Sequence, residues 1–230
     1  MERRSFLKKA GVAAGAGVLA ACTGAGDKAA GAAGGKVEWT LASSFPKNLD
    51  TIFGAAEVFA KHVAALSNGN FIINVKAAGE IVPGPEVLNA VQAKTVQMGH
   101  TASYYFFGKD ATFAFDTAVP FGMTSRQHTA WMMHGGGMEL MREFFKQHKV
   151  VNFLGGNTGT QMGGWYKKEI KTVEDLKGLK LRVGGFAGRV MSKMGVVPQQ
   201  IPGGEIYTAL EKGTIDGAEW VGPYDDEKLG

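Results

Sequence analysis

The sequence has 230 residues, of which 45% are hydrophobic and 20% are charged, and its formal net charge is +4. Three of these four positive charges lie in the first 21 residues, where Arg3, Arg4, Lys8 and Lys9 are opposed only by Glu2. The rest of the chain is nearly neutral and can bury one or two sizeable cores, so its composition argues against a nucleic-acid partner.

The N-terminus indicates export. Residues 1–21 combine a basic start, an apolar stretch shorter than the roughly 20 residues of a membrane-spanning helix, and small residues before Cys22. The start, RRSFLK, resembles a twin-arginine export signal. The sequence LAAC at residues 19–22 resembles a bacterial lipobox, which implies a lipid anchor on Cys22, the single cysteine. The alternative is an accidental cysteine in an alanine-rich run.

Short β-type runs and helical patterns alternate after a Gly- and Ala-rich stretch, residues 22–35, which we expect to be a flexible tether. The spacing of apolar residues predicts strands at 37–42, 71–75 and 96–101, with helices at 50–67 and from Pro85 onward. This order favours parallel strands joined by right-handed crossovers. We therefore expect an α/β first lobe, residues 36–157, whose ligand lies at the strand ends.

The second half repeats the alternation. Thr124 and Gln127 form a capping-box pattern that opens a long helix, interrupted or kinked at residues 135–137. Further strands are expected at 150–154, 159–165, 179–183, 199–201 and 215–221, with helices after Thr172 and at 187–194 and 205–212. The Gly-rich run 155–159 suits a chain crossing between lobes. Residues 158–217 are then a second lobe, and residues 218–230 return toward the first.

Two segments carry a family resemblance. DLKGLKLRV (residues 175–183) and IYTALEKGTIDGAEW (residues 206–220) resemble signature segments of the solute-binding proteins of tripartite ATP-independent periplasmic (TRAP) transporters. The resemblance runs from about Lys36 to the C-terminus. It implies a type II two-lobed periplasmic binding protein fold, in which each lobe is a mixed, mostly parallel sheet flanked by helices and the ligand lies in the interlobe cleft. It also implies a receptor rather than an enzyme, with the membrane components of the transporter as partners.

Family members continue past the position of Gly230, so the chain is expected to lack their last helices. A fragment of this kind could bind poorly. The members that dimerise do so through the part beyond Gly230, so a homodimer is an expectation for the full-length protein alone.

A narrower resemblance concerns the ligand. HTASYYFFGKD (residues 100–110) and QMGGW (residues 161–165) resemble the members that bind 2-oxo and 2-hydroxy monocarboxylates, such as pyruvate or lactate, together with a metal cation. This implies a periplasmic or extracytoplasmic receptor that uses Na⁺ or Ca²⁺ and no organic cofactor.

The residue chemistry fits that ligand. Arg182 offers a planar fork that matches a carboxylate. Glu219, expected on a facing strand, would repel an anionic ligand unless a cation lay between them. The expected cation ligands are three hard oxygens, from the Glu219 carboxylate, the Gln161 side chain and the Trp220 carbonyl. With Na⁺ the four charges balance, which favours Na⁺ only weakly over Ca²⁺. Without the resemblance, Arg182 and Glu219 would be interpreted as an ordinary surface pair.

Other residues have two interpretations. Tyr104 is the expected hydroxyl donor from the first lobe, and Tyr105 is the next choice because neighbouring strand residues face opposite ways. Asn157 either contacts the ligand or serves a turn. Trp165 and Trp220 either line the pocket or belong to the core.

Two other functions compete with transport. The same fold serves sensory modules that report a ligand to a membrane kinase. The run HGGG at residues 134–137 matches an esterase oxyanion loop, but the sequence has no G-x-S-x-G nucleophile motif, which argues against an exported hydrolase.

Overall fold

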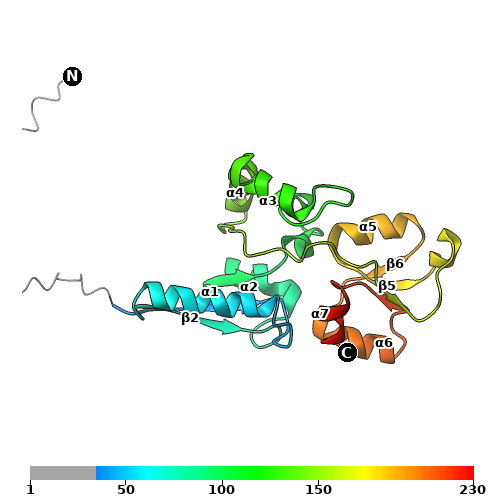
Figure 1. Cartoon of the computed structure of the whole chain (residues 1–230), viewed down its shortest axis with the longest axis horizontal. Coiled ribbons are helices and arrows are strands. Elements are labelled where there is room, and N and C mark those ends of the chain that lie inside the picture. Colours follow the sequence, from blue (N-terminus) through cyan, green and yellow to red (C-terminus); the bar gives the residue numbers. More distant parts are fainter. Residues whose placement is uncertain (1–34) are drawn as a thin grey trace, which may run out of the picture. The chain divides into compact units, whose positions relative to one another are not determined.

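A computed structural model describes residues 35–230, and every structural statement below concerns these residues (Figure 1). The predicted export signal, most of the predicted tether and the predicted lipid anchor on Cys22 lie outside them. In residues 35–230 no helix is long and apolar enough to cross a membrane.

The first sheet contains three parallel strands. β1 (Val37–Ser43) lies between β2 (Phe71–Lys76) and β3 (Met98–His100). α1 (Phe53–Leu66) connects β1 to β2, and α2 (Val87–Gln92) connects β2 to β3. The predicted β-α-β-α-β order with parallel pairing is therefore confirmed.

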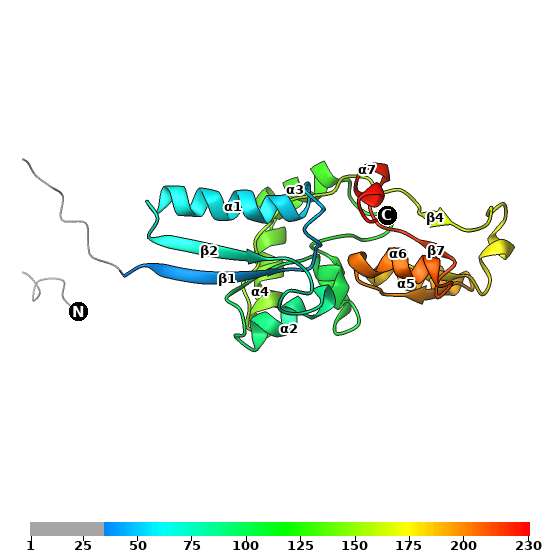
Figure 2. The same ribbon diagram turned by 90° about the horizontal axis from the view of Figure 1, so that it is seen from below.

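The two helices cover opposite faces of this sheet (Figure 2). Successive residues of a strand point to opposite sides. Leu41 packs with Ala56 of α1 and with Ile73, whereas Ala42 packs with Val87 of α2. Because β1 and β3 pair in parallel, their carboxyl ends lie together at one edge of the sheet, where the ligand of an α/β sheet is expected.

The predicted long helix is divided into α3 (Ser125–His134) and α4 (Gly137–Gln147). The Thr124 capping box forms as expected, since its hydroxyl accepts from the Gln127 N–H. The interruption falls at Gly136, whose φ of +83° is left-handed and favours glycine.

Two predicted strands are wrong. Residues 150–154 form no strand, and Val151 and Phe153 are 69% and 73% exposed. Residues 159–165 yield only β4 (Trp165–Tyr166) at their end. An apolar run becomes a strand only when another strand accepts and donates its backbone hydrogen bonds. No strand of residues 35–230 pairs with 150–154.

The second sheet has the order β4-β7-β5-β6. β5 (Lys180–Arg182) pairs in parallel with β6 (Val197–Gln199) and with β7 (Gly217–Ala218), and β4 pairs antiparallel with β7. The sheet is thus mixed and mostly parallel, as predicted. The remaining helical elements of this half are η4 (Val173–Leu176), α5 (Gly185–Lys193), η5 (Gly203–Glu205), α6 (Ile206–Glu211) and α7 (Pro223–Glu227).

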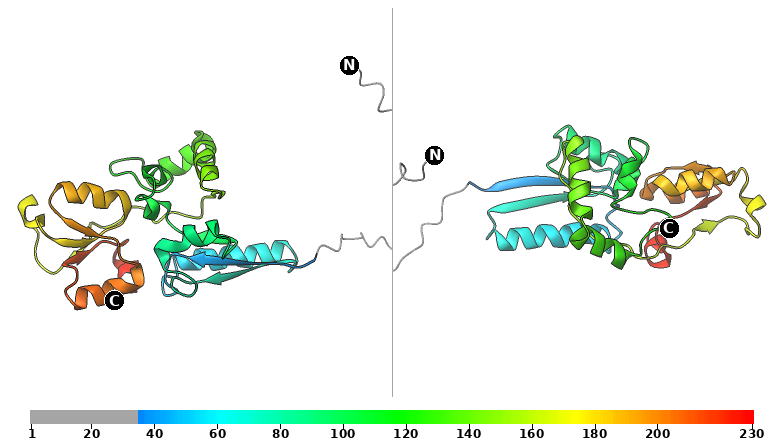
Figure 3. Two further views of the ribbon diagram at one scale, coloured as in Figure 1. Left: turned by 180° about the vertical axis from the view of Figure 1, so that it is seen from behind. Right: turned by 90° about the horizontal axis from the view of Figure 1, so that it is seen from above.

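The two halves share one apolar cluster, carried by segments that meet between the sheets (Figure 3). Its buried members are Phe45, Leu49, Phe53, Ala77, Ile206, Ile215, Ala218 and Trp220. α7 adds polar contacts to the loop before α1, because the Tyr224 hydroxyl donates to the Asp50 carboxylate over 3.0 Å and the Thr51 hydroxyl donates to Asp225. These contacts hold the chain after β7 against the first half.

Candidate carboxylate and cation site

Arg182 and Glu219 meet at the carboxyl ends of two adjacent strands. Arg182 ends β5 opposite Ala218 of β7, and Glu219 follows directly. The Arg182 Nη1 atom lies 3.6 Å from Glu219 Oε2, and the two side chains are 3% and 18% exposed. The expectation of facing strands is wrong because β5 and β7 are neighbours in one sheet. The alternative of a solvated surface pair is wrong as well, because both side chains are largely buried.

The guanidinium of Arg182 is held rigidly. Its Nε donates to the Ile201 carbonyl over 3.1 Å, its Nη1 donates to the Glu219 carbonyl, and its Cζ lies 4.7 Å from the centre of the Trp220 ring. Two of the five N–H donors are thus committed to backbone oxygens. The remaining three are left for neighbouring side chains and for a ligand oxygen pair.

Burial raises the pKa of Glu219 to about 7, while Arg182 works against this rise and Asp226 adds to it. A carboxylate of this kind is only partly ionised near neutral pH, despite its arginine neighbour. Additional positive charge next to Glu219 would favour its ionised form.

Gln161 completes a cluster of oxygen atoms. In one orientation its side-chain Nε2 donates to Glu219 Oε1 over 3.0 Å and to the Trp220 carbonyl over 3.3 Å, while its oxygen accepts from the Thr158 hydroxyl over 3.0 Å. In the other orientation its oxygen faces the same two oxygens and its Nε2 donates to Thr158. In that second orientation three hard oxygens face one another with no hydrogen atom between them. Oxygens of this kind are the ligands that Na⁺ and Ca²⁺ prefer.

The two tyrosines reach the site from a short 3-10 helix. Tyr104 and Tyr105 lie in η2 (Ser103–Phe106), not on a strand, so the expectation that they alternate between two faces is wrong. Burial raises the pKa of both hydroxyls, and the Arg182 charge opposes the rise at each. Both therefore lie close enough to Arg182 to respond to its charge.

η2 packs directly on the start of α5. The Gln200 side-chain amide donates to the Tyr105 carbonyl over 2.9 Å, and the rings of Phe107 and Phe186 stack with centroids 5.0 Å apart. Gly184 and Gly185 permit this approach, since a Cβ on Gly185 would lie 2.5 Å from Tyr104 Cδ2.

Replacing Gly185 by alanine is expected to lower the free energy of unfolding by about 1–3 kcal/mol, from backbone strain and overpacking. Gly185 has φ of +54°, and its new Cβ would also lie 2.6 Å from the Tyr104 carbonyl oxygen. Urea unfolding measures the loss. Gly213→Ala is the matched control, because φ there is +72° but a Cβ meets nothing within 4 Å. Equal losses in the two variants would contradict the packing argument.

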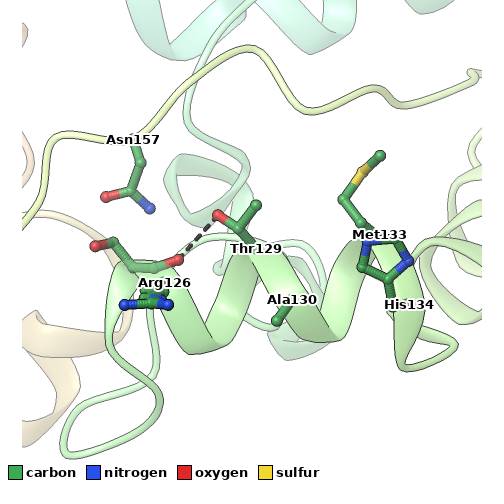
Figure 4. A pocket seen from close by; sticks show the side chains of 7 residues that line it. Arg126, Thr129, Ala130, Met133, His134 and Asn157 are labelled. Atoms are coloured by element: carbon green, nitrogen blue, oxygen red, sulfur yellow. Dashed lines mark hydrogen bonds between the residues drawn. The ribbon is translucent and has the colours of Figure 1, made fainter.

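Asn157 belongs to another region. Its side-chain oxygen accepts from the Gly159 N–H over 2.7 Å, which is a turn contact. The side chain also lines a cavity of about 430 Å³ along α3 and points toward the end that carries Arg126 (Figure 4). The turn interpretation fits these contacts, and they do not bring Asn157 to Arg182 or Glu219.

The chain matches the model of the bacterial extracellular solute-binding proteins of family 7, DctP, over residues 42–229. The chain belongs to this family. It is 52% identical over all 230 residues to a monocarboxylate 2-oxoacid-binding periplasmic protein of Nostoc sp., covering 63% of that protein.

Two solved TRAP solute-binding proteins are similar to this DctP-family chain. One, from Bordetella bronchiseptica, has calcium and picolinate in its active site; it is 52% identical with a TM-score of 0.84, over 86% of this chain and 59% of that one. The other, from Pseudoalteromonas atlantica, has bound sodium and pyruvate; it is 49% identical with a TM-score of 0.81, over 85% and 59%. The chain thus spans about 60% of the length of these relatives. The predicted two-lobed α/β fold of TRAP solute-binding proteins is confirmed.

The two tryptophans of this DctP-family member differ. Trp165 is 51% exposed and its indole N–H donates to Asp226 over 2.8 Å. Trp220 is 6% exposed and packs in the shared apolar cluster, as the core interpretation expects, and its ring also contacts the Arg182 guanidinium. Its indole N–H finds no acceptor within residues 35–230.

Sequence reasoning missed Asp226. Its carboxylate accepts hydrogen bonds from three N–H groups next to the site, and its charge helps to raise the pKa of Glu219. The available signal was the sequence GPYDD at residues 222–226, where Pro223 and acidic residues mark the start of a helix.

Proposed function

We propose that the chain is the solute-binding part of a TRAP transporter receptor that captures a 2-oxo or 2-hydroxy monocarboxylate together with Na⁺ or Ca²⁺. One observation carries this proposal: a buried arginine lies 3.6 Å from a largely buried carboxylate, and the Gln161 side-chain amide contacts both the other oxygen of that carboxylate and the Trp220 carbonyl.

Arg182 supports the anion half of the proposal. Its orientation is fixed by two backbone carbonyls and a tryptophan ring, so little conformational freedom is lost when a carboxylate binds. Further donors nearby are the Tyr104 and Tyr105 hydroxyls and the Trp220 indole N–H, which has no acceptor in the part of the chain that the structure describes. A buried N–H without an acceptor costs about 1–3 kcal/mol, which a ligand oxygen would recover.

Gln161, Glu219 and the Trp220 carbonyl support the cation half. When bound, the ion supplies positive charge that holds Glu219 and an anionic ligand together. The residues fit this group, because Gln161 can turn its oxygen toward Glu219 Oε1 and the Trp220 carbonyl while keeping its contact with Thr158.

The ligands bound by the two solved relatives share one chemical feature. Pyruvate and picolinate each carry a second donor atom next to a carboxylate, and each occurs with a cation in its protein. A ligand of this kind binds an arginine through its carboxylate and a metal through the same carboxylate and the neighbouring atom. This is why we propose the 2-oxo and 2-hydroxy acids over simple carboxylates.

We also propose residues 36–157 as the first lobe, 158–217 as the second and 218–230 as a return toward the first. The contacts of Tyr224 and Asp225 with the loop before α1 support that return. The family is one of extracellular solute-binding proteins. Twin-arginine export, lipid anchoring through Cys22 and dimerisation of the full-length protein remain our proposals, as do the membrane components of the transporter as partners.

Calorimetry with pyruvate, lactate and pyruvamide in calcium-containing buffer tests the proposal. We expect pyruvate or lactate to bind near the micromolar scale, which corresponds to about −8 kcal/mol. Pyruvamide keeps the 2-oxo group but has no charge for Arg182, so we expect it not to bind. Failure of every 2-oxo and 2-hydroxy monocarboxylate at about 1 mM, or equal binding of pyruvamide, would overturn the proposal.

A further inference from the structure

The Asp226 carboxylate and the Gln161 amide lie on opposite sides of the peptide group that joins Trp220 to Val221. One of its oxygens accepts from the Val221 N–H over 2.9 Å and from the Gly222 N–H over 3.0 Å, and its other oxygen accepts from the Trp165 indole over 2.8 Å. Three donors on one carboxylate fix its position.

The Val221 N–H belongs to the same peptide group as the Trp220 carbonyl. No peptide bond in residues 35–230 is cis, so in this planar group the N–H and the C=O point in opposite directions. Because Asp226 holds the N–H on its own side, the Trp220 oxygen must point away from Asp226. On that other side lies the Gln161 amide, 3.3 Å from the Trp220 oxygen.

A second contact sets the register of the two segments. The Met162 N–H donates to the Val221 carbonyl over 2.8 Å, which places Gln161 next to Trp220. The N–H groups of Val221 and Gly222 both donate to Asp226, so the peptide groups before and after the Val221 Cα are both held by hydrogen bonds. In the group before it, the charge of the Asp226 carboxylate polarises the Val221 N–H and makes the Trp220 oxygen of the same group more negative.

We propose that Asp226 is a positioning residue that orients and polarises the Trp220 carbonyl as a cation ligand. This inference rests on the proposed function, because it concerns the same cation. Outer partners of this kind commonly change metal affinity by about 10–100-fold when removed.

The test compares Asp226→Ala, Asp226→Asn and Trp165→Phe. Calcium is titrated calorimetrically in the presence of excess pyruvate, and pyruvate is titrated at saturating calcium. For Asp226→Ala we expect calcium affinity to fall about tenfold or more, with pyruvate affinity at saturating calcium within about threefold of the original protein. Asp226→Asn keeps an acceptor for Val221 but loses the charge, so its loss should be smaller. If Asp226→Ala does not fold, Asp226→Asn provides the test of calcium affinity.

Trp165→Phe is the matched control, since it removes one donor from Asp226 and leaves the Val221 and Gly222 contacts intact. We expect its calcium affinity to stay within about twofold, because only the third bond to Asp226 is lost. Hydrogen exchange of the Val221 amide should accelerate in Asp226→Ala and not in Trp165→Phe.

Unchanged calcium affinity in a folded Asp226 variant would overturn the inference while leaving the proposed function intact. A parallel loss of pyruvate affinity at saturating calcium would also overturn it, because that result indicates general damage. If the original protein binds pyruvate without any cation, the cation site itself fails and this inference fails with it.

Discussion

Arg182→Lys is expected to weaken pyruvate binding about 100-fold or more, equivalent to roughly 3 kcal/mol. A lysine ammonium is a single point of charge. It cannot hold the Ile201 and Glu219 carbonyls and still offer a carboxylate two parallel N–H groups. Calorimetry with pyruvate in calcium buffer measures the loss.

Arg189→Lys is the matched control for this substitution. Arg189 lies on α5 in the same half of the molecule but is exposed, so the exchange should leave pyruvate affinity within about twofold. Pyruvate affinity that survives in Arg182→Lys would show that the guanidinium geometry does not hold the ligand.

Glu219→Gln is expected to have opposite effects on binding and on stability. It removes the only charged oxygen ligand among the three proposed, so calcium affinity in the presence of pyruvate should fall at least about tenfold. It should also stabilise the ligand-free protein at high pH. The stability effect arises from the burial of Glu219, which disfavours its ionised form and raises its pKa.

The sign of the stability effect follows from the proton balance. Glu219 titrates near pH 7 in the folded protein and near its ordinary value of 4.5 in the unfolded chain. Between these values the folded state binds more protons, so the free energy of unfolding contributed by this group falls as pH rises through that window. At about pH 8 the glutamine variant should therefore be more stable, by on the order of 2 kcal/mol, and the advantage should disappear near pH 4.

Urea unfolding across this pH range, without calcium or ligand, measures the difference. Glu211→Gln serves as the control, because Glu211 is exposed and its replacement should not change the pH profile. A glutamine variant at position 219 that is destabilised at every pH would mean that the Arg182 ion pair outweighs burial.

The alternation of strands and helices was predictable because each element carries its own periodicity. β1, α1 and β2 lie within a few residues of their predicted bounds. Residues 150–154 show the limit of this reasoning. Apolar content alone does not provide the partner strand that a β-structure requires, and that partner depends on chain far away in sequence.

The members of the site were predictable from the family resemblance together with their chemistry, because residue types alone favoured a surface pair. Arg182, Glu219 and the Gln161 amide do converge, as the family resemblance implied. The neighbourhood of β5 and β7 was not predictable, since strand order depends on packing between distant segments. The 3-10 helix that carries Tyr104 likewise depends on its contacts with α5, and a local pattern does not contain them.

The most direct test of the shared anion and cation site is the dependence of pyruvate affinity on the cation. Pyruvate is titrated in buffers in which sodium is replaced stepwise by choline after calcium has been chelated, and each cation is then titrated with and without pyruvate. We predict that sodium or calcium raises pyruvate affinity and that pyruvate raises the affinity for that cation by the same factor. Equal pyruvate affinity in sodium, calcium and choline would contradict the account.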